Sequence, residues 1–465
     1  MNQWTLHSLK TIFTTFDPEL YIPITFLSFK IESLFGMNAW LFHLDNLLLH
    51  IANGILVAWI LIKLTRSRIA GVCAALIFAV HPINAETVVW ISARKDLLAT
   101  FFGLLSIMFA MRKSARLSII FFTLAALSKI SVVMLPLLLM VLTMQDGRRI
   151  RDNIKILAPL FAIAITLGVV ALVGKGSEIG SASVIERIVL AGYAISLSIS
   201  HFLLPAHIGL YYTLPAINTQ SILIAMIPLL LIVCAWIVRK KLPLVSIGIV
   251  WFFVFIIPTV FNIQTDIRSP GVTFASDRYL YLPSIGLLIA IVAVAMEVGK
   301  RMKREQTKNI ALALTSLLVI IFIPVTRAQV ATWNNADMLF AHALVISPQS
   351  VQARVSLAES LKQEGKIEEA FAILKQGLQF SDDPRLHLEA GVLYAAAGQV
   401  VEAEDQFKKV QAIEPRLVEA IYGIAMLRAH EGKKEEAEKL LRQAIELEPT
   451  YERAHLDLAE LLAHP

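Results

Sequence analysis

Long apolar runs alternate with short basic loops through the first two thirds of the chain, and this pattern limits the fold more than any other feature. Over 465 residues the hydrophobic content is 57% and the mean hydropathy is +0.67. A soluble domain of this length does not need so much apolar sequence, whereas each membrane-spanning helix needs about 20 apolar residues. The sequence therefore predicts an all-α, polytopic membrane protein.

The basic residues gather in the loops between the apolar runs. The clusters are Lys63/Arg66/Arg68, Arg112/Lys113/Arg116, Arg148/Arg149/Arg151/Lys155, Arg239/Lys240/Lys241 and Lys300–Lys308. Such clusters are typical of cytoplasmic loops of membrane proteins rather than of a nucleic-acid-binding surface. The net charge of +6 therefore indicates a membrane lipid environment and no nucleic-acid partner. The two cysteines, Cys73 and Cys234, lie in apolar runs and indicate no disulfide framework.

Residues 1–38 mix aromatic and polar side chains, and we expect them to form an outer loop and an interfacial helix. The first clear span is Trp40–Leu64, and no cleavable signal peptide is visible before it. Four polar side chains recur along this span at helical spacing. They are His43, Asn46, His50 and Asn53. Because they share one face of a helix, that face should point into the protein rather than toward lipid.

The segment Leu76–Leu105, LIFAVHPINAETVVWISARKDLLATFFGLL, places charged residues between two apolar runs. Ionisable residues at the mouth of a membrane hairpin are costly and need a water-filled cavity, a partner or a ligand. We therefore expect this hairpin to line the cavity in which the chemistry takes place. The residues expected in the cavity walls are His81, Asp96, His43 and Tyr279.

Further apolar runs predict about ten to twelve membrane helices within residues 39–326. The stretch Ile185–Tyr212 breaks the alternation and predicts a re-entrant or interfacial pair bent at Pro205. With every basic cluster in the cytoplasm, the loop Pro82–Lys95 and everything after Val325 lie on the opposite face of the membrane. The chemistry would then take place on the non-cytoplasmic side.

After Trp333 the sequence becomes a repeat, with spacings of 33 and 34 residues. The recurring residues are Gly365, Gly398 and Gly432, Ala370, Ala403 and Ala437, and Pro415 and Pro449. The order of small and large residues in Pro384–Pro415 matches the tetratricopeptide pattern. Residues 333–465 are therefore expected to form about three repeats with capping helices. Such an α-solenoid has a concave surface that binds extended peptides or partner helices, and a docking or dimerisation role is equally open.

Four stretches carry a resemblance to a known family. They are FHLDNLLLHIAN (Phe42–Asn53), LIFAVHPINAETVVWISARKDLLATFF (Leu76–Phe102), WFFVFIIP (Trp251–Pro258) and SDRYLYLPSIG (Ser276–Gly286). Together with the repeats they resemble the transmembrane and tetratricopeptide-repeat-containing O-mannosyltransferases and their prokaryotic relatives. The resemblance implies a GT-C glycosyltransferase fold, in the cell (inner) membrane if the chain is prokaryotic. It also implies transfer of a sugar, mannose in this family, from a polyprenyl-phosphate carrier to protein Ser or Thr hydroxyls.

The chain departs from the family pattern in three places. The resemblance implies an earlier transmembrane helix followed by an acidic residue or pair in the first outer loop, which is taken as the family's catalytic site, and this chain begins inside what corresponds to that loop. The family's basic-acidic step reads Ser128-Lys129-Ile130 here, without the acid. The Tyr-Arg-Pro-Leu-like stretch reads Tyr21-Ile22-Pro23-Ile24, without the arginine. Whether this chain is an active enzyme is therefore left open at this point.

A phosphate-linked donor needs cations at the membrane surface, and the forked donors of arginine suit it best. Arg94, Lys129 and Arg278 fall at the predicted outer ends of spans, where positive charge is unusual. We therefore expect these three residues to bind the donor phosphate. The alternative is that they extend to lipid headgroups or pair with Asp96 or Asp277.

Inverting glycosyl transfer needs a carboxylate that accepts the proton of the acceptor hydroxyl. The candidates are Glu86, at the mouth of the hairpin, and Asp17, in the outer loop. For Glu86 the alternative is a structural role, as an ion-pair partner of Arg94 or as a helix cap. The histidines show no metal-ligand spacing, so the sequence predicts no metal-binding residues and leaves a divalent-metal requirement open.

Three functions are compatible with these features. The first is the glycosyltransferase, with the repeats holding a protein acceptor. The second is another lipid-glycan enzyme, such as an O-antigen-ligase-like protein, although only the loop Asn262–Arg278 resembles the long outer loop of that class. The third is a non-catalytic, membrane-anchored repeat scaffold. The ionisable residues retained in Leu76–Asp96 argue against the scaffold.

Overall fold

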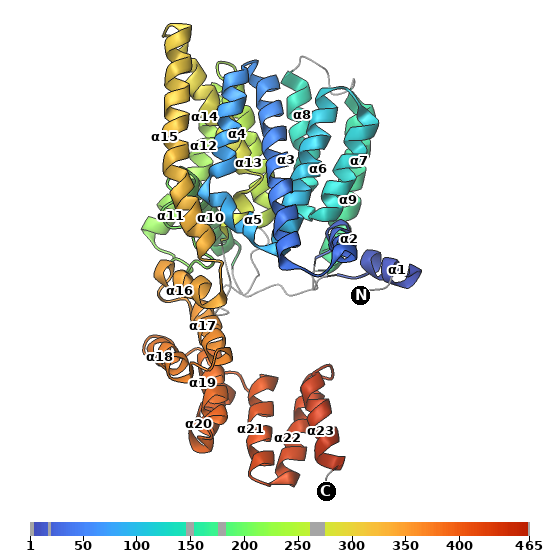
Figure 1. Ribbon diagram of the computed structural model, residues 1–465, viewed down its shortest axis with the longest axis vertical. Helices are drawn as coiled ribbons and strands as arrows, with labels where there is room; N and C mark the ends of the chain where they lie inside the picture. The colour runs from blue at the N-terminus through green and yellow to red at the C-terminus, as the bar shows by residue number, and fades with distance from the viewer. Residues whose placement is uncertain (1–3, 17–19, 146–152, 175–182, 261–274, 464–465) are drawn as a thin grey trace. The chain divides into compact units, whose positions relative to one another are not determined.

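The computed structural model describes residues 4–16, 20–145, 153–174, 183–260 and 275–463. Helices are the regular elements throughout these ranges, which confirms the all-α prediction (Figure 1). The chain divides into two compact units. The first comprises Met1–Gly209, Leu214–Arg268 and Val272–Trp333, and the second comprises Leu210–Thr213, Ser269–Gly271 and Asn334–Pro465.

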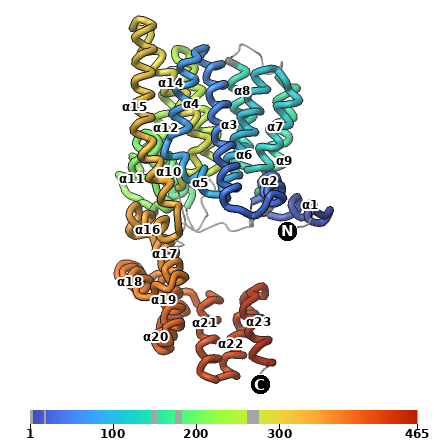
Figure 2. The backbone as a smooth tube through the Cα atoms, viewed as in Figure 1, coloured from blue at the N-terminus to red at the C-terminus, as the bar shows by residue number. Residues whose placement is uncertain are grey.

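The first unit is a bundle of helices that Figure 2 traces from blue to yellow. Its α-helices are α1 (Leu6–Thr14), α2 (Pro23–Glu32), α3 (Ala39–Thr65), α4 (Arg68–Val80), α5 (Ala85–Val89), α6 (Arg94–Met111), α7 (Ala115–Ser128), α8 (Leu135–Gln145), α9 (Ile154–Gly174), α10 (Val184–Leu203), α11 (Thr219–Ala225), α12 (Ile227–Val238), α13 (Pro243–Val260), α14 (Ser284–Gly299) and α15 (Arg304–Ala331). Short 3-10 helices matter for the site: η2 (Pro82–Asn84), η3 (Ile91–Ala93), η4 (Ile130–Met134) and η6 (Asp277–Leu280).

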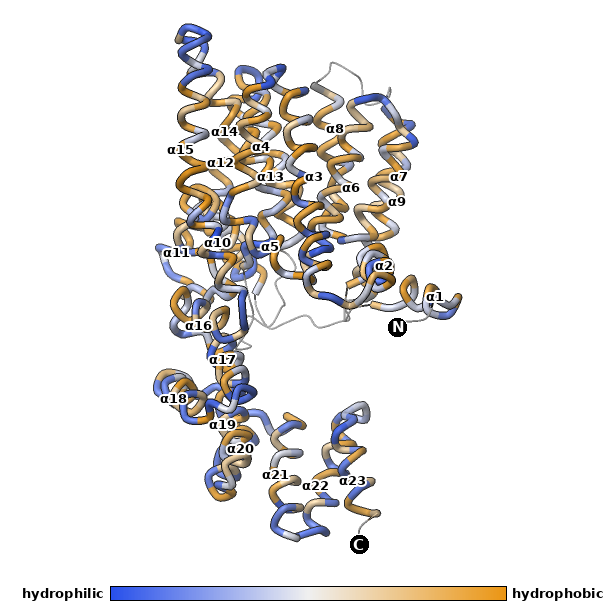
Figure 3. Tube along the Cα trace, in the orientation of Figure 1, coloured by the Kyte–Doolittle hydropathy of each residue, from blue (hydrophilic) through white to orange (hydrophobic). Residues whose placement is uncertain are grey.

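The bundle is built for a membrane. In the described residues six helical segments are long and apolar enough to cross a bilayer. These are α3, α9, α10, α11 with α12, α13 and α15. A seventh arises if α4 and the segment Pro82–Val89, which bend by 54° at His81, form one broken span. The chain is therefore a multi-pass membrane protein, and apolar residues dominate its bundle helices (Figure 3).

The sequence predicted ten to twelve membrane helices, whereas six or seven segments of the described residues are long and apolar enough to span a bilayer. Two features explain the difference. Helix α6 begins with three charged residues, Arg94, Lys95 and Asp96, and so is less apolar than a spanning helix. Helices α7, α8 and α14 are shorter than 18 residues. The stretch around Pro205 also differs in detail from the expected bent pair, because residues Val184–Leu203 form one helix that ends before the proline.

Close helix contacts in the bundle depend on glycine. A Cβ atom on Gly248 of α13 would lie 2.4 Å from the carbonyl oxygen of Gly286, and a Cβ atom on Gly286 would lie 2.4 Å from the Gly248 oxygen. A Cβ atom on Gly71 of α4 would lie 2.4 Å from Ile62 Cγ1 and 2.8 Å from the Ala58 carbonyl oxygen, both of α3. Because nothing larger than hydrogen fits at these crossings, the backbones approach closely and bring the polar ends of the helices together.

Side-chain contacts show which helix ends meet. His50 and Asn53 of α3 both contact the Tyr281 hydroxyl, and Asn53 also bonds the Leu97 carbonyl of α6. The amino ends of α3, α6 and α14 therefore lie at one end of the bundle, with the carboxyl end of α4. The basic clusters at the α3–α4, α6–α7 and α14–α15 turns lie at the opposite end (Figure 1).

The second unit consists of α16 (Ala336–Ile346), α17 (Val351–Gln363), α18 (Ile367–Leu378), α19 (Pro384–Ala396), α20 (Val400–Ile413), α21 (Val418–His430), α22 (Lys434–Leu447) and α23 (Glu452–Ala463). Three antiparallel pairs, α17 with α18, α19 with α20 and α21 with α22, follow one another between α16 and α23. The turn inside each pair contains a glycine with a left-handed φ, +80° at Gly365, +74° at Gly398 and +76° at Gly432.

Large and small residues interlock between successive pairs of the second unit. The Phe407 ring of α20 is 2% exposed and fills the space beside Gly391 of α19 and Gly423 of α21. A Cβ atom on either glycine would lie within 2.7 Å of that ring. The periodic glycines of the sequence lie in the turns, and other glycines, Gly391 and Gly423, lie at the crossings where neighbouring helices touch.

Candidate functional site

Three buried ion pairs lie at the polar end of the bundle, and each joins segments far apart in the sequence. Arg94 pairs with Glu32, Lys129 with Asp96, and Arg278 with Glu86. The sequence had predicted all three cations as donor-phosphate ligands. In the structure Arg94 is enclosed by protein, whereas Lys129 and Arg278 both lie beside the ring of Tyr279.

Arg94 is surrounded by protein. Its guanidinium donates to both oxygens of Glu32, to the Phe42 carbonyl at 2.7 Å and, through Nε, to Asn46 Oδ1 at 2.9 Å. The residue is 1% exposed, and the Phe29 ring lies 4.7 Å from its Cζ. Arg94 therefore ties α2 and α3 to the first turn of α6, and its partners occupy the donors that a phosphate would need.

The loop between α4 and α6 is held from α3. Asn46 donates from Nδ2 to the carbonyls of Val88 and Trp90, both at 3.2 Å, while its Oδ1 accepts from Arg94. On the next turn His50 accepts from the Tyr281 hydroxyl and bonds the Ala79 carbonyl. The polar face of α3 is therefore interhelical contact rather than a ligand site, in keeping with amides and imidazoles between membrane helices.

Lys129 and Asp96 form a second buried ion pair. Lys129 follows α7 with an extended backbone, φ −159° and ψ 126°, which turns the chain toward η4. Its ammonium group donates to Asp96 Oδ1 and lies 5.0 Å from the centre of the Tyr279 ring. In the sequence Ile130 follows Lys129, and the acid that pairs with Lys129 comes from the first turn of α6.

Arg278 approaches the same tyrosine from another side. Its Nη1 donates to Glu86 Oε1 at 2.9 Å, and its Cζ lies 5.0 Å from the Tyr279 ring and 4.8 Å from the Trp90 ring. The Arg278 side chain is 18% exposed, whereas that of Glu86 is 3% exposed. One tyrosine ring thus lies beside two cations from different helices, each of which also has a carboxylate partner.

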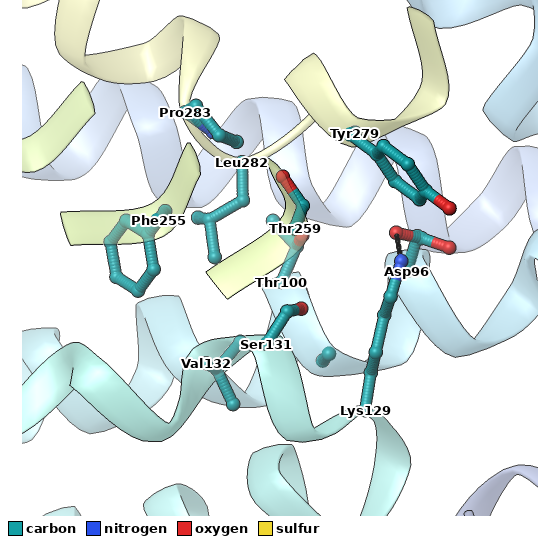
Figure 4. Close-up of a pocket in the computed structure, with 11 residues that line it drawn as sticks. Asp96, Thr100, Lys129, Ser131, Val132, Phe255, Thr259, Tyr279, Leu282 and Pro283 are labelled. Carbon is teal, nitrogen blue, oxygen red and sulfur yellow. Dashed lines mark hydrogen bonds and ion pairs between the residues drawn. The ribbon is translucent and has the colours of Figure 1, made fainter. Parts of the chain in front are cut away.

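A small cavity lies next to the Lys129–Asp96 pair (Figure 4). Its volume of about 20 Å³ is room for about one water molecule. The lining residues are Asp96, Ala99, Thr100, Lys129, Ser131, Val132, Phe255, Thr259, Tyr279, Leu282 and Pro283. Of the predicted site residues, the structure brings Asp96, Lys129 and Tyr279 to this cavity, with Arg278 against the same tyrosine.

The predicted cavity residue His81 lies elsewhere. Its Nδ1 accepts from the Ile83 amide, so its Nε2 donates to the Phe202 carbonyl at 3.0 Å, and its ring stacks on Phe202 with centroids 4.8 Å apart. Both ring nitrogens are therefore used in fixing the bend after α4. His81 is a buried structural residue and does not line the cavity.

The prediction that His43 faces inward is wrong, because the side chain is exposed. His43 is ten residues from Asn53, which turns it roughly 80° around the helix from that residue. It also lies in the opening turns of α3, where Trp40 is 66% exposed. Asp17, one of the two candidate bases, lies outside the described residues. The described part of the chain holds no group of three residues arranged to bind a metal ion.

Sequence reasoning missed one buried acid and the partners of another. Glu32, the partner of Arg94, gave no signal because it lies in an interfacial segment with no motif. Asp277 bonds His201 at 2.8 Å and accepts from the Gly209 amide at 3.3 Å. Sequence reasoning considered Asp277 only as an ion-pair partner of the predicted phosphate ligands, whereas the structure pairs it with His201.

Comparison with known proteins bears on both units. The tetratricopeptide repeat family matches residues 418–451, which are α21 and α22. Protein O-mannosyl-transferase TMTC3 from Homo sapiens is 23% identical over 95% of this chain and 55% of its own length. Protein O-mannosyl-transferase tmtc2 from Xenopus laevis is 37% identical over 20% of this chain and 11% of its own length. This chain is related to the TMTC protein O-mannosyl-transferases.

The relationship to TMTC proteins confirms the resemblance that the four sequence stretches and the repeats predicted. The match includes nearly all of this chain but only about half the length of the human TMTC3 protein. The match over 95% of the chain includes both the bundle and the repeats, so the two units occur together in the relative. Which residues act in any reaction is not decided by this likeness and depends on the geometry above.

Proposed function

We propose that this protein transfers a sugar, mannose by analogy with its relatives, from a polyprenyl-phosphate carrier to Ser or Thr hydroxyls of a protein on the non-cytoplasmic side. The relatives are named protein O-mannosyl-transferases, which supports the reaction class. The observation that carries the proposal is the meeting of Lys129 and Arg278 at Tyr279, beside a small cavity.

Lys129 and Arg278 would bind the carrier phosphate from two sides. In this reaction the bond between the sugar C1 and the phosphate oxygen breaks, so negative charge grows on the phosphate. Cations fixed close to that oxygen stabilise the developing charge, and charge-assisted hydrogen bonds in a poorly solvated site are the strong ones. Arg278 offers a fork for two phosphate oxygens, and Lys129 offers a mobile point charge.

Arg94 supports this site without belonging to it. Its bonds to Glu32, Asn46 and the Phe42 carbonyl fix the start of α6, and Asp96 lies two residues further along. We therefore assign Arg94 a positioning role and leave phosphate binding to the other two cations. Glu86, the sequence candidate for the base, holds Arg278 in place.

The distribution of charge supports the proposed orientation. The polar site lies at the opposite end of the bundle from the basic turns, and basic turns stay in the cytoplasm. The carboxyl end of α15 lies near the site end, since Thr326 bonds the Val80 carbonyl at 2.7 Å. The repeats that follow α15 would then be outside the cytoplasm, where they could hold an extended acceptor segment.

Cysteine labelling tests the orientation. In a background of Cys73→Ala and Cys234→Ser, the variant Gln399→Cys should react with an impermeant maleimide on intact cells. The matched variant Lys240→Cys, in the α12–α13 turn, should react only after permeabilisation. The reverse pattern would place the site and the repeats in the cytoplasm and contradict the proposal.

Transfer itself is tested on the full chain in nanodiscs, with polyprenyl-phosphate mannose and a Ser/Thr-rich acceptor peptide. We expect Lys129→Met and Arg278→Gln each to weaken donor binding at least tenfold, because each removes a charge-assisted contact of about 1.5–3 kcal/mol. Arg239→Gln, at the basic end of the bundle, is the matched control. If the wild type and the three variants bind the donor equally well, Lys129 and Arg278 do not form the donor site. If the wild-type chain binds no donor, the non-catalytic scaffold is favoured.

A further inference from the structure

Two basic turns lie at the end of the bundle opposite Lys129 and Arg278, and they carry no acids. One turn joins α3 to α4 and the other joins α6 to α7, and both are hydrophilic ends of apolar helices (Figure 3). Their six cations form an exposed basic patch: Lys63, Arg66, Arg68, Arg112, Lys113 and Arg116. Residues 46–85 and 97–145 contain no Asp or Glu, and none of the six cations has an ion-pair partner among the described residues.

The Trp59 ring of α3 joins the two turns. The Lys63 Nζ atom lies 5.7 Å from the centre of this ring, and the Arg112 Cζ atom lies 5.0 Å from it. Two like charges from different turns therefore gather at one indole, where no carboxylate offsets their repulsion. The α14–α15 turn at the same end differs, because its Lys300 pairs with Glu297 at 2.6 Å.

Each of the two turns also holds a basic residue in a left-handed backbone conformation. Arg66 has a φ of +57° and Lys113 a φ of +63°, and within the described residues they are the two non-glycine positions with positive φ. Glycine adopts this conformation without strain, as at Gly398 in the repeats, whereas a side chain makes it costly. Membrane orientation needs positive charge in these turns but no particular direction of it. The strained positions therefore indicate that the direction of these two cations matters.

The helix surfaces next to the basic patch are apolar and open. Ile55, Trp59 and Lys63 follow one another at intervals of four residues and so share one face of α3, on which Ile55 is 64% exposed. On α7, Ile120 is 52% exposed and lies one turn from Arg116. These faces present a cation at the helix end and apolar surface further along the helix. A ligand that matches both has a charged headgroup and hydrocarbon chains.

We propose that the basic patch binds the headgroup of an anionic phospholipid in the leaflet at that end of the bundle. Lys63 and Arg112 donate to the phosphate oxygens, and an acyl chain follows the apolar face of α3. Charge-assisted hydrogen bonds to phosphate are strong, and the phosphate offsets the repulsion between the cations. Basic sites between membrane helices are known to hold such headgroups. The site is separate from the proposed transfer reaction, and neither depends on the other.

Native mass spectrometry of the full chain in neutral detergent tests the site with two lipid probes. These are phosphatidylglycerol and phosphatidylcholine with the same acyl chains, which differ in net headgroup charge. We expect the wild type to bind phosphatidylglycerol roughly tenfold more tightly, because the anionic headgroup meets several uncompensated cations. The double variant Lys63→Gln/Arg112→Gln should lose about tenfold in phosphatidylglycerol affinity, since it removes two charge-assisted contacts. Its affinity for phosphatidylcholine should not change.

The matched control is Lys300→Gln/Lys308→Gln. It removes the same charge from the same end of the bundle, but these two cations already pair with Glu297 and Glu305. The control should therefore keep the wild-type preference for phosphatidylglycerol. Melting temperature and monodispersity in neutral detergent confirm that each variant folds.

Lys113→Gly separates a lipid ligand from a residue that only ends the helix. Glycine relieves the left-handed conformation, so the variant should melt at a higher temperature than the wild type without added lipid. Its phosphatidylglycerol affinity should nevertheless fall about threefold, because one cation near the phosphate is lost. A variant that melts higher and keeps full affinity would remove Lys113 from the site.

Three results would contradict the proposal as a whole. The first is a wild type that binds the two lipids equally well. The second is an equal loss of phosphatidylglycerol affinity in the two double variants, which would show that general positive charge attracts the lipid. The third is displacement of the lipid by an equal concentration of glycerol 3-phosphate, which has the same phosphate chemistry without acyl chains. That result would assign the basic patch to a soluble phosphate compound.

Discussion

The bundle and the repeat unit use charge in opposite ways. In the bundle the ion pairs Arg94–Glu32, Lys129–Asp96 and Arg278–Glu86 are buried and join residues 62, 33 and 192 positions apart. In the repeats many pairs join exposed neighbours on one helix, such as Lys409 with Asp405. Residues 334–465 contain 14 Lys and Arg against 22 Asp and Glu, while the preceding residues contain 28 against 14.

The difference shows where charge is costly. A buried pair survives only where geometry and further hydrogen bonds offset desolvation, so its presence points to a fold constraint or to a ligand. An exposed pair is screened and contributes little. The bundle pairs are therefore informative about function, and the repeat pairs describe a solvated surface. The following predictions test this contrast, beginning with the largest effect.

Arg94→Met should destabilise the bundle most, because it leaves Glu32 buried without its cation. Removal of one partner of a buried pair costs about 3–5 kcal/mol in the free energy of unfolding. The double variant Arg94→Met/Glu32→Gln should recover part of this loss. Thermal unfolding in nanodiscs measures both variants. If the double variant is as unstable as the single one, packing against Phe29 and Phe42 rather than charge dominates at this position.

The two close glycine crossings should respond differently to alanine. At Gly248 the added Cβ would meet a backbone oxygen, which cannot move away, so we expect a loss of about 2–3 kcal/mol. At Gly391 it would meet the Phe407 side chain, which can shift, and the gain in helix propensity offsets about 1 kcal/mol. Hydrogen exchange of the full chain compares the two variants. Equal losses at the two sites would mean that the bundle is as adaptable as the repeats.

The ion pair of Glu404 with Arg428 in the repeats is more exposed than Arg94–Glu32 in the bundle and less exposed than Lys409–Asp405. The hydrogen bond from Arg428, together with one from Lys408, lowers the pKa of Glu404 from its ordinary 4.5 to about 2. Because the folded pKa is the lower one, the pair stabilises the fold above pH 4.5, and this contribution is lost as the pH falls toward 2. Its contact with solvent limits the effect to about 1 kcal/mol.

Glu404→Gln tests this linkage at matched pH. Hydrogen exchange of peptides from α20 and α21 in the full chain should show less protection in the variant at pH 5, and the difference from wild type should shrink by pH 3. Comparison at the same pH removes the intrinsic pH dependence of exchange. A difference that stays constant from pH 5 to pH 3 would show that the carboxylate charge is not what stabilises this contact.

The sequence predicted the fold class well because apolar runs and a 34-residue period are local signals. An apolar run of sufficient length predicts a membrane-spanning helix, and a glycine such as Gly398 predicts a turn with a left-handed φ. Neither prediction depends on the rest of the chain. The relationship to TMTC proteins was likewise predictable, since contiguous stretches such as Leu76–Phe102 carry it. The number of spanning helices was less predictable, because α6 begins with three charged residues and α14 is only 16 residues long.

The candidate site could be predicted only in part, since it consists of pairings between distant helices. Lys129 and Arg278 were found because a cation at a span end is unusual in itself. The sequence could not show that Tyr279 joins them, or that Arg94, equally unusual, pairs with Glu32 from a segment without any motif. Periodicity placed His43 on the polar face of α3, but ten residues of helix turn it roughly 80° from Asn53, and its side chain is exposed.

The exposed pair Asp405–Lys409 should have the smallest effect of all. Its oxygen and nitrogen lie 2.7 Å apart on adjacent turns of α20, and the two side chains are 59% and 48% exposed. A double-mutant cycle with Asp405→Asn and Lys409→Gln should give a coupling energy below about 0.5 kcal/mol, because solvent and salt screen the pair. The same cycle on Arg94 and Glu32 should give several times more. Coupling energies of equal size in the two cycles would mean that burial does not set the strength of these pairs, and the bundle charges would then lose their value as a guide to the site.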